Sequence, residues 1–490
     1  MTRPHFSRIL VANRGEIAVR ILRTVRALGA HGVIVHHASD ADSPGVKLAD
    51  TAIEIEGTPV GAYLDGDQII AKAVAAGAEA IHPGYGFLSE NAAFARRVAE
   101  AGMVFIGPTP DAIELMGDKV RSRNFVAGRG FPVAPSAIED DDPASFIERA
   151  RAVGTPLLIK PSAGGGGKGM RIVRDLALLE DEVMRARSEG KRYFGDGRLY
   201  AERYIERPRH IEVQVLGDAH DNVVHLFERE CSLQRRFQKI VEESPSPGLS
   251  VEERERICAA AAGIASAAGY RNAGTVEFIY GAGEFYFLEM NTRLQVEHPV
   301  TEEVTGIDLV AEQIRIAAGE PLGYDQDAVR STGHAIELRL YAEDATRDFA
   351  PTTGRILAWR PPDGVRVDAG VAMGSRVTTA FDPMLAKIVV HGTDRADAIA
   401  RARSALRGFV VLGCGTNAGF LDRLLTDPDV AAGRLHTGMI GEKPQLAIEP
   451  PLEGATLIDI LGLAARAIKP VRDAADAVPA MHTAMGAWRN

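Results

Sequence analysis

Four consecutive glycines at positions 164–167 stand between two short apolar runs, and they constrain the local fold more than any other feature of the chain. The runs, residues 157–159 and 171–173, are typical of strands, and Lys160 and Lys168 flank the glycines. Glycine lets backbone N–H groups converge on an anion, so this segment indicates a phosphate-binding flap between strands. A flexible linker is the alternative, but such linkers usually lack cations. A Walker A motif is excluded, because the lysine is followed by glycine rather than by Ser or Thr.

The composition narrows the class of protein. At 490 residues the chain exceeds the size of a single core, so we expect about two to four domains. We expect neither a membrane nor a secreted protein, since no apolar run approaches the roughly 18 residues of a span and no signal peptide is evident. Three scattered cysteines fit a reducing cytoplasm rather than a disulfide framework. The net charge of −10 disfavours a nucleic-acid partner.

The order of apolar runs predicts a multidomain chain of α/β and α+β parts. Residues 8–110 alternate short strand-like runs with helical patterns, which favours a parallel βαβ sheet. The segments 13–16 and 82–86 then follow strands and should meet at one edge of that sheet. One helix and a connector are expected over 111–135, and the glycine run lies in a small α/β segment, 136–205, that could act as a lid.

The pattern changes after residue 205. Long alternating runs between 209 and 291, with an Ala-rich helix near 251–269, predict an antiparallel sheet. Residues 333–440 mix strands with a helix near 396–408, and 441–490 resemble a linker or docking helix. No internal repeat is evident, which argues against a duplicated synthetase.

A predicted hairpin over 274–291 brings oxygen ligands together. Its simplest register sets Glu277 nearly opposite Glu289, and Asn291 shares their face. Facing carboxylates are destabilising without a cation, and carboxylate and amide oxygens suit magnesium or manganese. The alternative is an exposed polar face on which both glutamates are solvated.

The next residues, 291–299, concentrate reactive side chains. Arg293 can bind a planar oxyanion, and Glu297 could take a proton from a substrate held there. An exposed Arg293–Glu297 salt bridge on a loop is the alternative. The segment 230–239, which follows a predicted strand, carries three cations and indicates an anion site, although a solvated strand end remains open. Cys231 receives no catalytic role, and His210 and Tyr85 are ambiguous alone.

Seven segments together resemble the biotin carboxylases, in the order found in that family. They are ANRGEIAVR, HPGYGFLSEN, MGDK, KPSAGGGGKGM, RHIEVQV, ECSLQRRFQK and EMNTRLQVEHPVTE, and the resemblance runs from about Ile9 to residue 440. It implies an ATP-grasp fold with an N-terminal pre-ATP-grasp domain over 1–115, an ATP-grasp domain over 116–330 that carries a mobile lid over about 136–205, and a C-terminal biotin carboxylase domain over 331–440. Residues 441–490, a linker or docking tail, lie beyond the resemblance.

The resemblance also implies the reaction. ATP and bicarbonate form carboxyphosphate, and the CO2 released from it carboxylates biotin at N1′ on a carrier, the first half-reaction of an acyl-CoA carboxylase. Glu297 removes the bicarbonate proton, Arg339 stabilises the biotin enolate-like oxygen, and Tyr85 shapes the biotin site. Bicarbonate is held by Lys239, Arg293, Gln295 and Val296, and Mg2+ or Mn2+ by Glu277, Glu289 and Asn291. The residues implied to bind the nucleotide are Lys119, Lys160, Gly165, Gly166, Gly167, Met170, Glu202, Tyr204, Ile205, His210 and Gln234.

Two positions depart from the family pattern. Phe237 stands where many bacterial members have histidine, and Arg203 stands where some have lysine, so we expect altered nucleotide contacts rather than lost activity. None of the eleven methionines precedes a lysine, so the Met-Lys pair of a biotin acceptor is absent. We therefore expect a biotin carboxylase subunit or truncated α-subunit that serves a biotin carrier protein or domain and a carboxyltransferase subunit. The family resemblance also suggests a homodimer.

Three other classes of protein are the alternatives. Another ATP-grasp ligase would share the ATP and metal residues but not the cluster from Arg293 to Glu297. A catalytically silent nucleotide-binding regulator would bind ATP without bicarbonate-dependent turnover, and the presence of Glu297 argues against it. A dinucleotide-binding oxidoreductase would need a GxGxxG motif after the first strand, which residues 13–17 lack. The acyl-CoA finally carboxylated does not follow from this sequence, because a partner carboxyltransferase selects it.

Overall fold

The computed structural model describes residues 5–139, 145–161, 170–194 and 197–450, together with Ile458 and Gly462. The glycine run, including Gly165, Gly166 and Gly167, lies outside these residues, so the predicted phosphate flap is not described. The chain divides into two compact units, residues 1–446 and 447–490. The elements from β1 to α16 all belong to the first unit.

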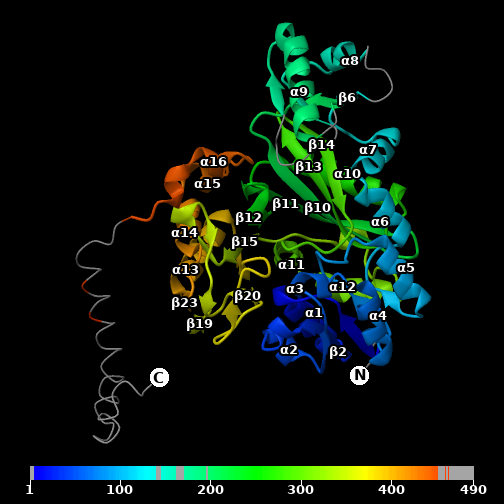
Figure 1. Cartoon of the computed structure of the whole chain (residues 1–490), viewed down its shortest axis with the longest axis vertical. Helices are drawn as coiled ribbons and strands as arrows, with labels where there is room; N and C mark the ends of the chain where they lie inside the picture. The colour runs from blue at the N-terminus through cyan, green and yellow to red at the C-terminus, as the bar shows by residue number, and fades with distance from the viewer. Residues whose placement is uncertain are drawn as a thin grey trace, which may run out of the picture. The chain divides into compact units, whose positions relative to one another are not determined.

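A five-stranded parallel sheet with strand order β3-β2-β1-β4-β5 forms the N-terminal part. This part is drawn in blue in Figure 1. Its strands are β1 (Arg8–Val11), β2 (His31–His37), β3 (Thr51–Ile55), β4 (Ala80–His82) and β5 (Val104–Phe105). Its helices are α1 (Gly15–Ala27), α2 (Pro44–Leu48), α3 (Pro59–Ala62), α4 (Gly66–Ala75) and α5 (Ala92–Glu100), with a 3-10 turn, η1 (Ala38–Asp40). The parallel sheet expected from the βαβ pattern is confirmed.

The loops after β1 and β4 meet at one edge of the sheet, as predicted, and the structure places them where the strand order reverses. Asn13 joins them: its Nδ2 donates to the carbonyl oxygen of Pro83 at 2.6 Å and to that of Tyr85 at 2.8 Å. Asn13 is buried, so these bonds are shielded from water. The contact fixes the backbone that carries Glu16 and Tyr85 toward the rest of the molecule.

Two helices, rather than the one expected, follow this sheet. They are α6 (Pro110–Gly117) and α7 (Lys119–Gly128). Asp118 separates them, because its side chain accepts hydrogen bonds from the backbone N–H groups of Val120 and Arg121 and so caps a new helix. The cap leaves Lys119 at the first position of α7.

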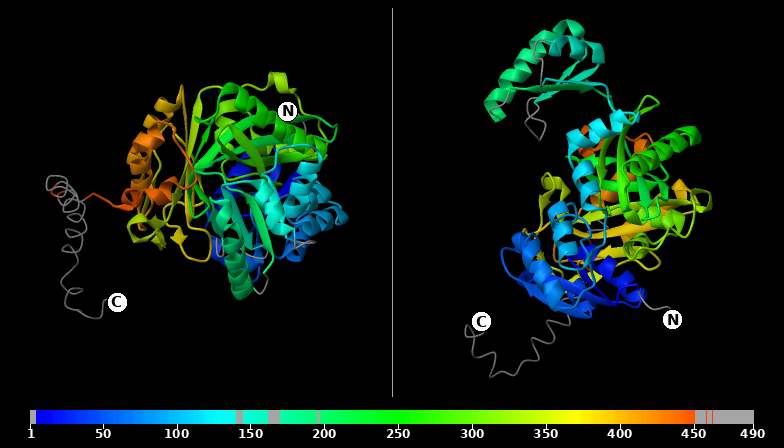
Figure 2. Two further views of the ribbon diagram at one scale, coloured as in Figure 1. Left: turned by 90° about the horizontal axis from the view of Figure 1, so that it is seen from above. Right: turned by 90° about the vertical axis from the view of Figure 1, so that its right-hand side faces the viewer.

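A separate four-stranded antiparallel sheet, of order β6-β9-β7-β8, carries the segment expected to form a lid. Its elements are β6 (Ser136–Ile138), α8 (Phe146–Val153), β7 (Leu157–Pro161), β8 (Arg171–Val173), η2 (Leu176–Leu178), α9 (Leu179–Phe194) and β9 (Leu199–Arg203). Helices α8 and α9 cover one face of this sheet (Figure 2). Their apolar side chains form a core of their own with the strands. The segment is therefore a small α/β layer, as predicted.

The centre of the molecule is an eight-stranded sheet of order β14-β13-β10-β11-β12-β15-β22-β20. Its strands are β10 (Arg209–Gly217), β11 (Val223–Arg235), β12 (Gln238–Ser244), β13 (Asn272–Gly281), β14 (Glu284–Asn291), β15 (His334–Tyr341), β20 (Arg366–Ala369) and β22 (Met384–Gly392), and every pair is antiparallel. Helix α10 (Val251–Ala267), which begins with a capping box at Ser250, confirms the predicted Ala-rich helix. Helices α11 (His298–Thr305) and α12 (Leu309–Ala317) follow β14.

The sheet extends beyond the range expected for it, because strands from residues 334–392 continue it past β12. The remaining short elements are η3 (Gln326–Ala328), β16 (Glu343–Asp344), η4 (Ala345–Arg347), β17 (Ala350–Pro351), β18 (Gly354–Arg355), β19 (Ala358–Arg360), β21 (Arg376–Val377) and β23 (Val410–Leu412). The later helices are α13 (Arg395–Gly408), α14 (Ala418–Thr426), α15 (Pro428–Ala431), α16 (Met439–Glu442) and η5 (Pro444–Ala447). The helix predicted near 396–408 is thus confirmed.

No helix within the described residues is both long enough and apolar enough to cross a membrane.

Replacing Asn13 with alanine tests the hydrogen bonds by which Asn13 connects the loops after β1 and β4. We expect a loss of about 1–3 kcal/mol in the free energy of unfolding, because two buried carbonyl oxygens lose their donor. Urea unfolding of Asn13→Ala against the wild type measures the loss, with Glu100→Ala, on the exposed face of α5, as a control expected to change stability by less than about 0.5 kcal/mol. Equal stability of the two variants would contradict this role.

Candidate active site

The hairpin of β13 and β14 brings the three predicted metal ligands together. Glu277 lies directly opposite Glu289 in the register, and Asn291 lies opposite Thr275, two positions away on the same face. Glu277 is 4% exposed, so the alternative of a solvated polar face is wrong for that residue. The Nδ2 of Asn291 donates to Oε1 of Glu277 at 2.9 Å, and Glu289 forms an ion pair with Lys119 at 3.0 Å. Two carboxylates and one amide oxygen are a donor set that fits Mg2+.

Lys239 lies at the centre of the acidic cluster. Its Nζ donates to Oε1 of Glu277 at 2.9 Å, to Oε1 of Glu297 at 2.6 Å and to Glu212. Burial opposes the charge of the ammonium, but the three carboxylates outweigh it and raise the pKa of Lys239 well above its ordinary value. Conversely, Glu277 and Glu297 resist protonation: burial acts against their charge, yet the neighbouring cations lower the pKa of each carboxyl.

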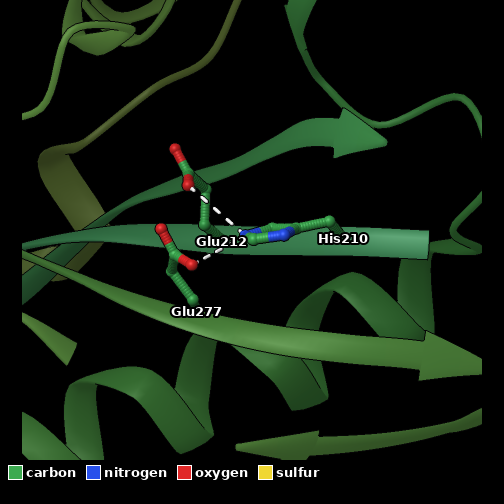
Figure 3. Close-up of side chains that lie close together, drawn as sticks. All are labelled: His210, Glu212 and Glu277. Atoms are coloured by element: carbon green, nitrogen blue, oxygen red, sulfur yellow. Dashed lines mark ion pairs between the residues drawn. The ribbon is translucent and has the colours of Figure 1, made fainter. Parts of the chain in front are cut away.

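His210 approaches the same carboxylates from β10. Figure 3 shows its ring directed at Glu212 and Glu277, with Nε2 2.9 Å from Oε2 of Glu277 and 4.0 Å from Oε2 of Glu212. One donor atom from each of the three residues falls within 4.8 Å of the others, close enough to share an ion. The ammonium of Lys239 already binds both glutamates, so their charge is compensated by a side chain in this structure.

Glu297 is held between two cations. Besides Lys239, the Nη2 of Arg339 donates to Oε2 of Glu297 at 2.9 Å. Glu297 is 2% exposed, so the exposed loop salt bridge considered from the sequence is wrong. The other side of Arg339 is occupied as well, because its Nε donates to Oε1 of Glu242 at 2.6 Å.

Arg293 reaches the cluster from one edge. Its Nη2 donates to Oδ1 of Asn291 at 2.8 Å, and its Nε donates to Oε2 of Glu90 at 2.9 Å. Gln295 lies deeper and donates to Oε1 of Glu277 at 2.8 Å. The carbonyl oxygen of Val296 accepts a hydrogen bond from Lys387 at 2.7 Å. The structure therefore brings Arg293, Gln295, Glu297, Lys239 and Arg339 into one connected network.

A fully buried arginine supports this network from beneath. The guanidinium of Arg229 donates to Oε1 of Glu212 at 2.6 Å and to Oε1 of Gln295 at 2.7 Å. It also donates to Gln214, Thr275 and Thr301 at 2.9–3.1 Å. Breaking a buried ion pair of this kind is strongly destabilising, so Arg229 fixes the position of the residues that it contacts.

The three cations of segment 230–239, which were predicted to form one anion site, bind different partners. The segment belongs to a hairpin of β11 and β12 rather than following a strand. Arg235 pairs with Glu343 at 2.9 Å and Arg236 with Asp348 at 2.6 Å, whereas Lys239 enters the acidic cluster. The side chain of Phe237 is 86% exposed at the turn. The three cations therefore do not converge on one anion.

The lid residues predicted to bind nucleotide lie on β7 and β9 and in the segment that leaves the lid. Lys160 forms an ion pair with Glu202 at 2.7 Å. Tyr204 and Ile205 lie between β9 and β10, and Met170, immediately before β8, is exposed. Arg203 donates to the carbonyl oxygen of Val153 at 2.6 Å, which ties it to the lid itself.

Two further predicted residues have defined contacts. Gln234 donates from Nε2 to the carbonyl oxygen of Cys231 at 2.7 Å and lies 3.0 Å from Nδ1 of His210. The hydroxyl of Tyr85 donates to Glu16, which also lies 3.3 Å from Lys387.

Sequence reasoning missed several charged residues in this network: Glu90, Glu212, Arg229, Glu242, Glu337 and Lys387. The sequence contained a signal that could have identified some of these residues. Glu337 and Arg339 alternate with apolar residues in a strand that is buried throughout, and a charged residue in such a strand needs a partner. Glu212 shows the same pattern on β10, whereas Arg229 stands between Glu228 and Glu230 in a buried stretch of β11.

The antiparallel core, the paired oxygen ligands and the separate small α/β layer define the class of an ATP-grasp ligase. Family models match most of the chain: the biotin carboxylase N-terminal domain over residues 5–113, the ATP-binding domain of the carbamoyl-phosphate synthase L chain over 118–324, and the biotin carboxylase C-terminal domain over 337–442. The chain belongs to the biotin carboxylase family and is an ATP-dependent ligase that carboxylates biotin.

Similar proteins agree with this family. The chain is 47% identical to the biotin carboxylase of Nostoc sp., covering 89% of this chain and 99% of that one. It is also 47% identical to the biotin carboxylase of Haemophilus influenzae, covering 87% and 96%. The mitochondrial alpha chain of methylcrotonoyl-CoA carboxylase from Arabidopsis thaliana is 47% identical as well, but the match covers 88% of this chain and only 60% of that protein.

A solved structure shares the fold as well. The biotin carboxylase domain dimer of Hydrogenobacter thermophilus 2-oxoglutarate carboxylase, in complex with MgADP, ADP and bicarbonate, has a TM-score of 0.82 and 44% identity. The match covers 91% of this chain and 99% of that one.

Replacing Lys239 with methionine tests its role as the central cation. At pH 7 we expect a loss of about 3–5 kcal/mol in the free energy of unfolding, because three buried carboxylates lose their shared donor. The pKa values of Glu277 and Glu297 are lowered in the folded wild type, so Lys239 contributes stability above their unfolded value of 4.5. Without Lys239 these carboxyls can take up protons, so the deficit shrinks as the pH falls from 7 toward 5.

Urea unfolding across that pH range provides the measurement. Lys443→Met is the matched control, because Lys443 pairs with Asp427 and Asp429 near the surface and its loss is expected to cost about 1 kcal/mol or less. A Lys239→Met deficit that does not change with pH would contradict the assignment.

Proposed function

We propose that this chain uses MgATP and bicarbonate to carboxylate the N1′ of biotin on a carrier protein or domain. Different residues of this site are proposed to bind the nucleotide, to bind and deprotonate bicarbonate, and to stabilise the biotin anion. The observation that carries the proposal is the position of Glu297, which is buried between Lys239 and Arg339 and connected through Lys239 to the predicted metal ligand Glu277. This arrangement sets a proton acceptor, two cations and a set of metal ligands side by side.

The nucleotide is proposed to lie between the lid and the β13–β14 hairpin. Lys119, Lys160 and His210 contact its phosphates or ribose, and residues 202–205 line the adenine. Gly165, Gly166, Gly167, Met170 and Gln234 complete this set. Glu277, Glu289 and Asn291 would hold Mg2+, or Mn2+ in its place, and the ion would neutralise charge on the phosphates of ATP.

Bicarbonate is proposed to bind Lys239, Arg293, Gln295 and the backbone at Val296. Glu297 is ionised in the resting structure and can accept the bicarbonate proton, but its lowered pKa makes it a weak base. The incoming anion would compete with Glu297 for the ammonium of Lys239, and that competition raises the affinity of Glu297 for a proton. The deprotonated substrate then attacks the γ-phosphate of ATP to give carboxyphosphate and ADP.

Biotin is proposed to react after carboxyphosphate has decomposed to CO2 and phosphate. The phosphate takes the N1′ proton, and Arg339 stabilises the negative charge that develops on the ureido oxygen. Tyr85 helps to shape the biotin site, and its hydroxyl is held by Glu16. A preorganised guanidinium suits this task because it needs no rearrangement when the charge appears.

The domain limits that we propose are 1–115, 116–330 with the lid over about 136–205, 331–440 and a tail over 441–490. The three family matches, over 5–113, 118–324 and 337–442, support these limits. The N-terminal limit precedes α7, which carries Lys119 into the ATP-grasp part.

The proposed partners are a biotin carboxyl carrier and a carboxyltransferase subunit that acts on an acyl-CoA. The absence of a Met-Lys pair from the sequence supports a carrier segment other than these 490 residues. The dimeric form of the Hydrogenobacter relative supports a homodimer. A cytoplasmic location is supported by three cysteines that are all free.

The Glu297→Gln variant tests the reaction. ADP release is measured from purified protein with Mg2+, bicarbonate and free biotin, leaving out each in turn. We expect wild-type turnover to require bicarbonate, to rise with biotin, and to fall by about 100-fold or more in the variant, because general-base catalysis typically contributes that much. ATP binding without bicarbonate-dependent turnover in the wild type would instead favour a silent regulator or another ligase.

The Glu289→Gln variant tests the metal site. We expect the Mg2+ concentration for half-maximal turnover to rise by about tenfold or more, since one of the proposed oxygen ligands loses its charge. Glu284→Gln, on the same strand but exposed, is the matched control and should leave the Mg2+ requirement unchanged. An equal Mg2+ requirement in the two variants would remove Glu289 from the proposed ligand set.

A further inference from the structure

Two glutamates that the reaction scheme does not use face each other behind Arg339. Glu242 on β12 and Glu337 on β15 are direct partners in the antiparallel register, and each is 0% exposed. Like charges in facing positions of a sheet are destabilising, and burial makes their repulsion stronger. The pair is therefore stable only if one of the two carboxyls keeps a proton.

The hydrogen bonds distinguish the two members. Glu242 accepts from Nε of Arg339 at 2.6 Å, a charge-assisted bond that favours its ionised form. Neither carboxyl oxygen of Glu337 has a hydrogen-bond partner among the described residues. An ionised carboxylate left without a donor in the interior is very costly, so the proton belongs on Glu337.

The charged and titratable neighbours leave Glu337 without a cation of its own. After burial, the charge of Lys387 on β22 has the largest effect on the pKa of Glu337 and lowers it, but the Nζ of Lys387 is bonded to Val296 and lies 3.3 Å from Glu16. Arg339 on the same strand is shared between Glu242 and Glu297. The other groups that act on the pair are Lys239 on β12, Glu297 at the start of α11, Cys231 on β11, Tyr341 on β15 and Tyr85 after β4.

We propose that Glu242 and Glu337 share one proton, held by Glu337, and that the ionised Glu242 is the positioning residue that keeps Arg339 in place when Glu297 becomes protonated. This inference rests on the proposed function of Glu297 and Arg339. When Glu297 accepts a proton it loses the charge that attracts Arg339. Glu242 still holds the guanidinium through both Nε and Nη2, so only the Nη2 hydrogen that Glu297 releases becomes available to the biotin oxygen.

The pH dependence follows from the same geometry. Burial raises the pKa of Glu337 well above its ordinary value, and burial raises that of Glu242 to about 7 despite Arg339. When the pH rises far enough to ionise Glu337, a second negative charge appears beside Arg339 and competes with Glu297 and the substrate for it. The pair therefore sets an alkaline limit on turnover.

Three variants test the proposal: Glu242→Gln, Glu337→Gln and, as the matched control, Glu243→Gln. Glu243 is adjacent on β12 but is bound to His334 and Arg395, outside the site, both at 2.7 Å. Kinetics are measured as ADP release with free biotin over a range of pH. Glu242→Gln should lower kcat by about 10–100-fold with little change in the KM for ATP, because Arg339 is misplaced while the nucleotide residues are intact.

Glu337→Gln should move the alkaline limb of kcat to higher pH, since glutamine copies a neutral carboxyl that cannot ionise. Glu243→Gln should leave the pH profile unchanged. An unchanged kcat in Glu242→Gln, or an alkaline limb that does not move in Glu337→Gln, would overturn the proposal.

Two measurements without turnover separate this inference from the proposed function. The difference between the infrared spectra of the wild type and of Glu337→Gln at neutral pH should contain the carbonyl band of one protonated carboxyl group. Glu337 has a raised pKa in the folded state, so the wild type should lose stability relative to Glu337→Gln as the pH rises above the unfolded value of 4.5. Glu243 has a lowered pKa, so the deficit of Glu243→Gln should shrink as the pH falls.

A difference spectrum without that band, or a Glu337→Gln variant that is destabilised at neutral pH as Glu243→Gln is, would show that Glu337 is ionised and would overturn the proposal. Failure of wild-type turnover alone would count against the proposed function and not against the shared proton.

Discussion

The ammonium of Lys239 is the interaction on which the rest of the site depends. It binds carboxylates from three separate elements: Glu212 on β10, Glu277 on β13 and Glu297 at the start of α11. Each of these carboxylates is buried, and without a shared cation their mutual repulsion would favour protonation or separation. The lysine thus holds the predicted metal ligand and the predicted proton acceptor in one charged network, and Arg229 supports that network from below.

Local patterns were enough to predict much of the fold. The order of apolar runs predicted the parallel N-terminal sheet, the antiparallel core and helix α10. Glu277 was expected nearly opposite Glu289, and a register shift between Glu277 and Phe278 makes the two direct partners. One helix was expected where two occur, since the break at Asp118 depends on a cap rather than on a change in periodicity. The length of the central sheet was also missed, because pairing of β12 with β15 joins residues nearly a hundred positions apart and leaves no local signal.

The residues of the candidate site could likewise be predicted from the sequence only in part. Residues in short motifs, such as Arg293 and Glu297, could be named from the sequence and its family resemblance. Their partners could not, because Glu90, Glu242 and Arg229 come from distant strands and loops and become neighbours only after folding. The three cations of segment 230–239 show the opposite error, since neighbours in sequence were expected to act together but point to different partners.

Lys387 has a consequence for how the enzyme is made. It lies on β22, and its side chain contacts Val296 beside the site and Glu16 from the N-terminal sheet. One buried ammonium therefore connects Glu16, Val296 and β22, which are synthesised at three different times. A ribosome that has completed the N-terminal sheet and the β13–β14 hairpin still lacks the strand that closes this contact, so the nascent chain acquires a finished site only after β22, Met384–Gly392, has emerged.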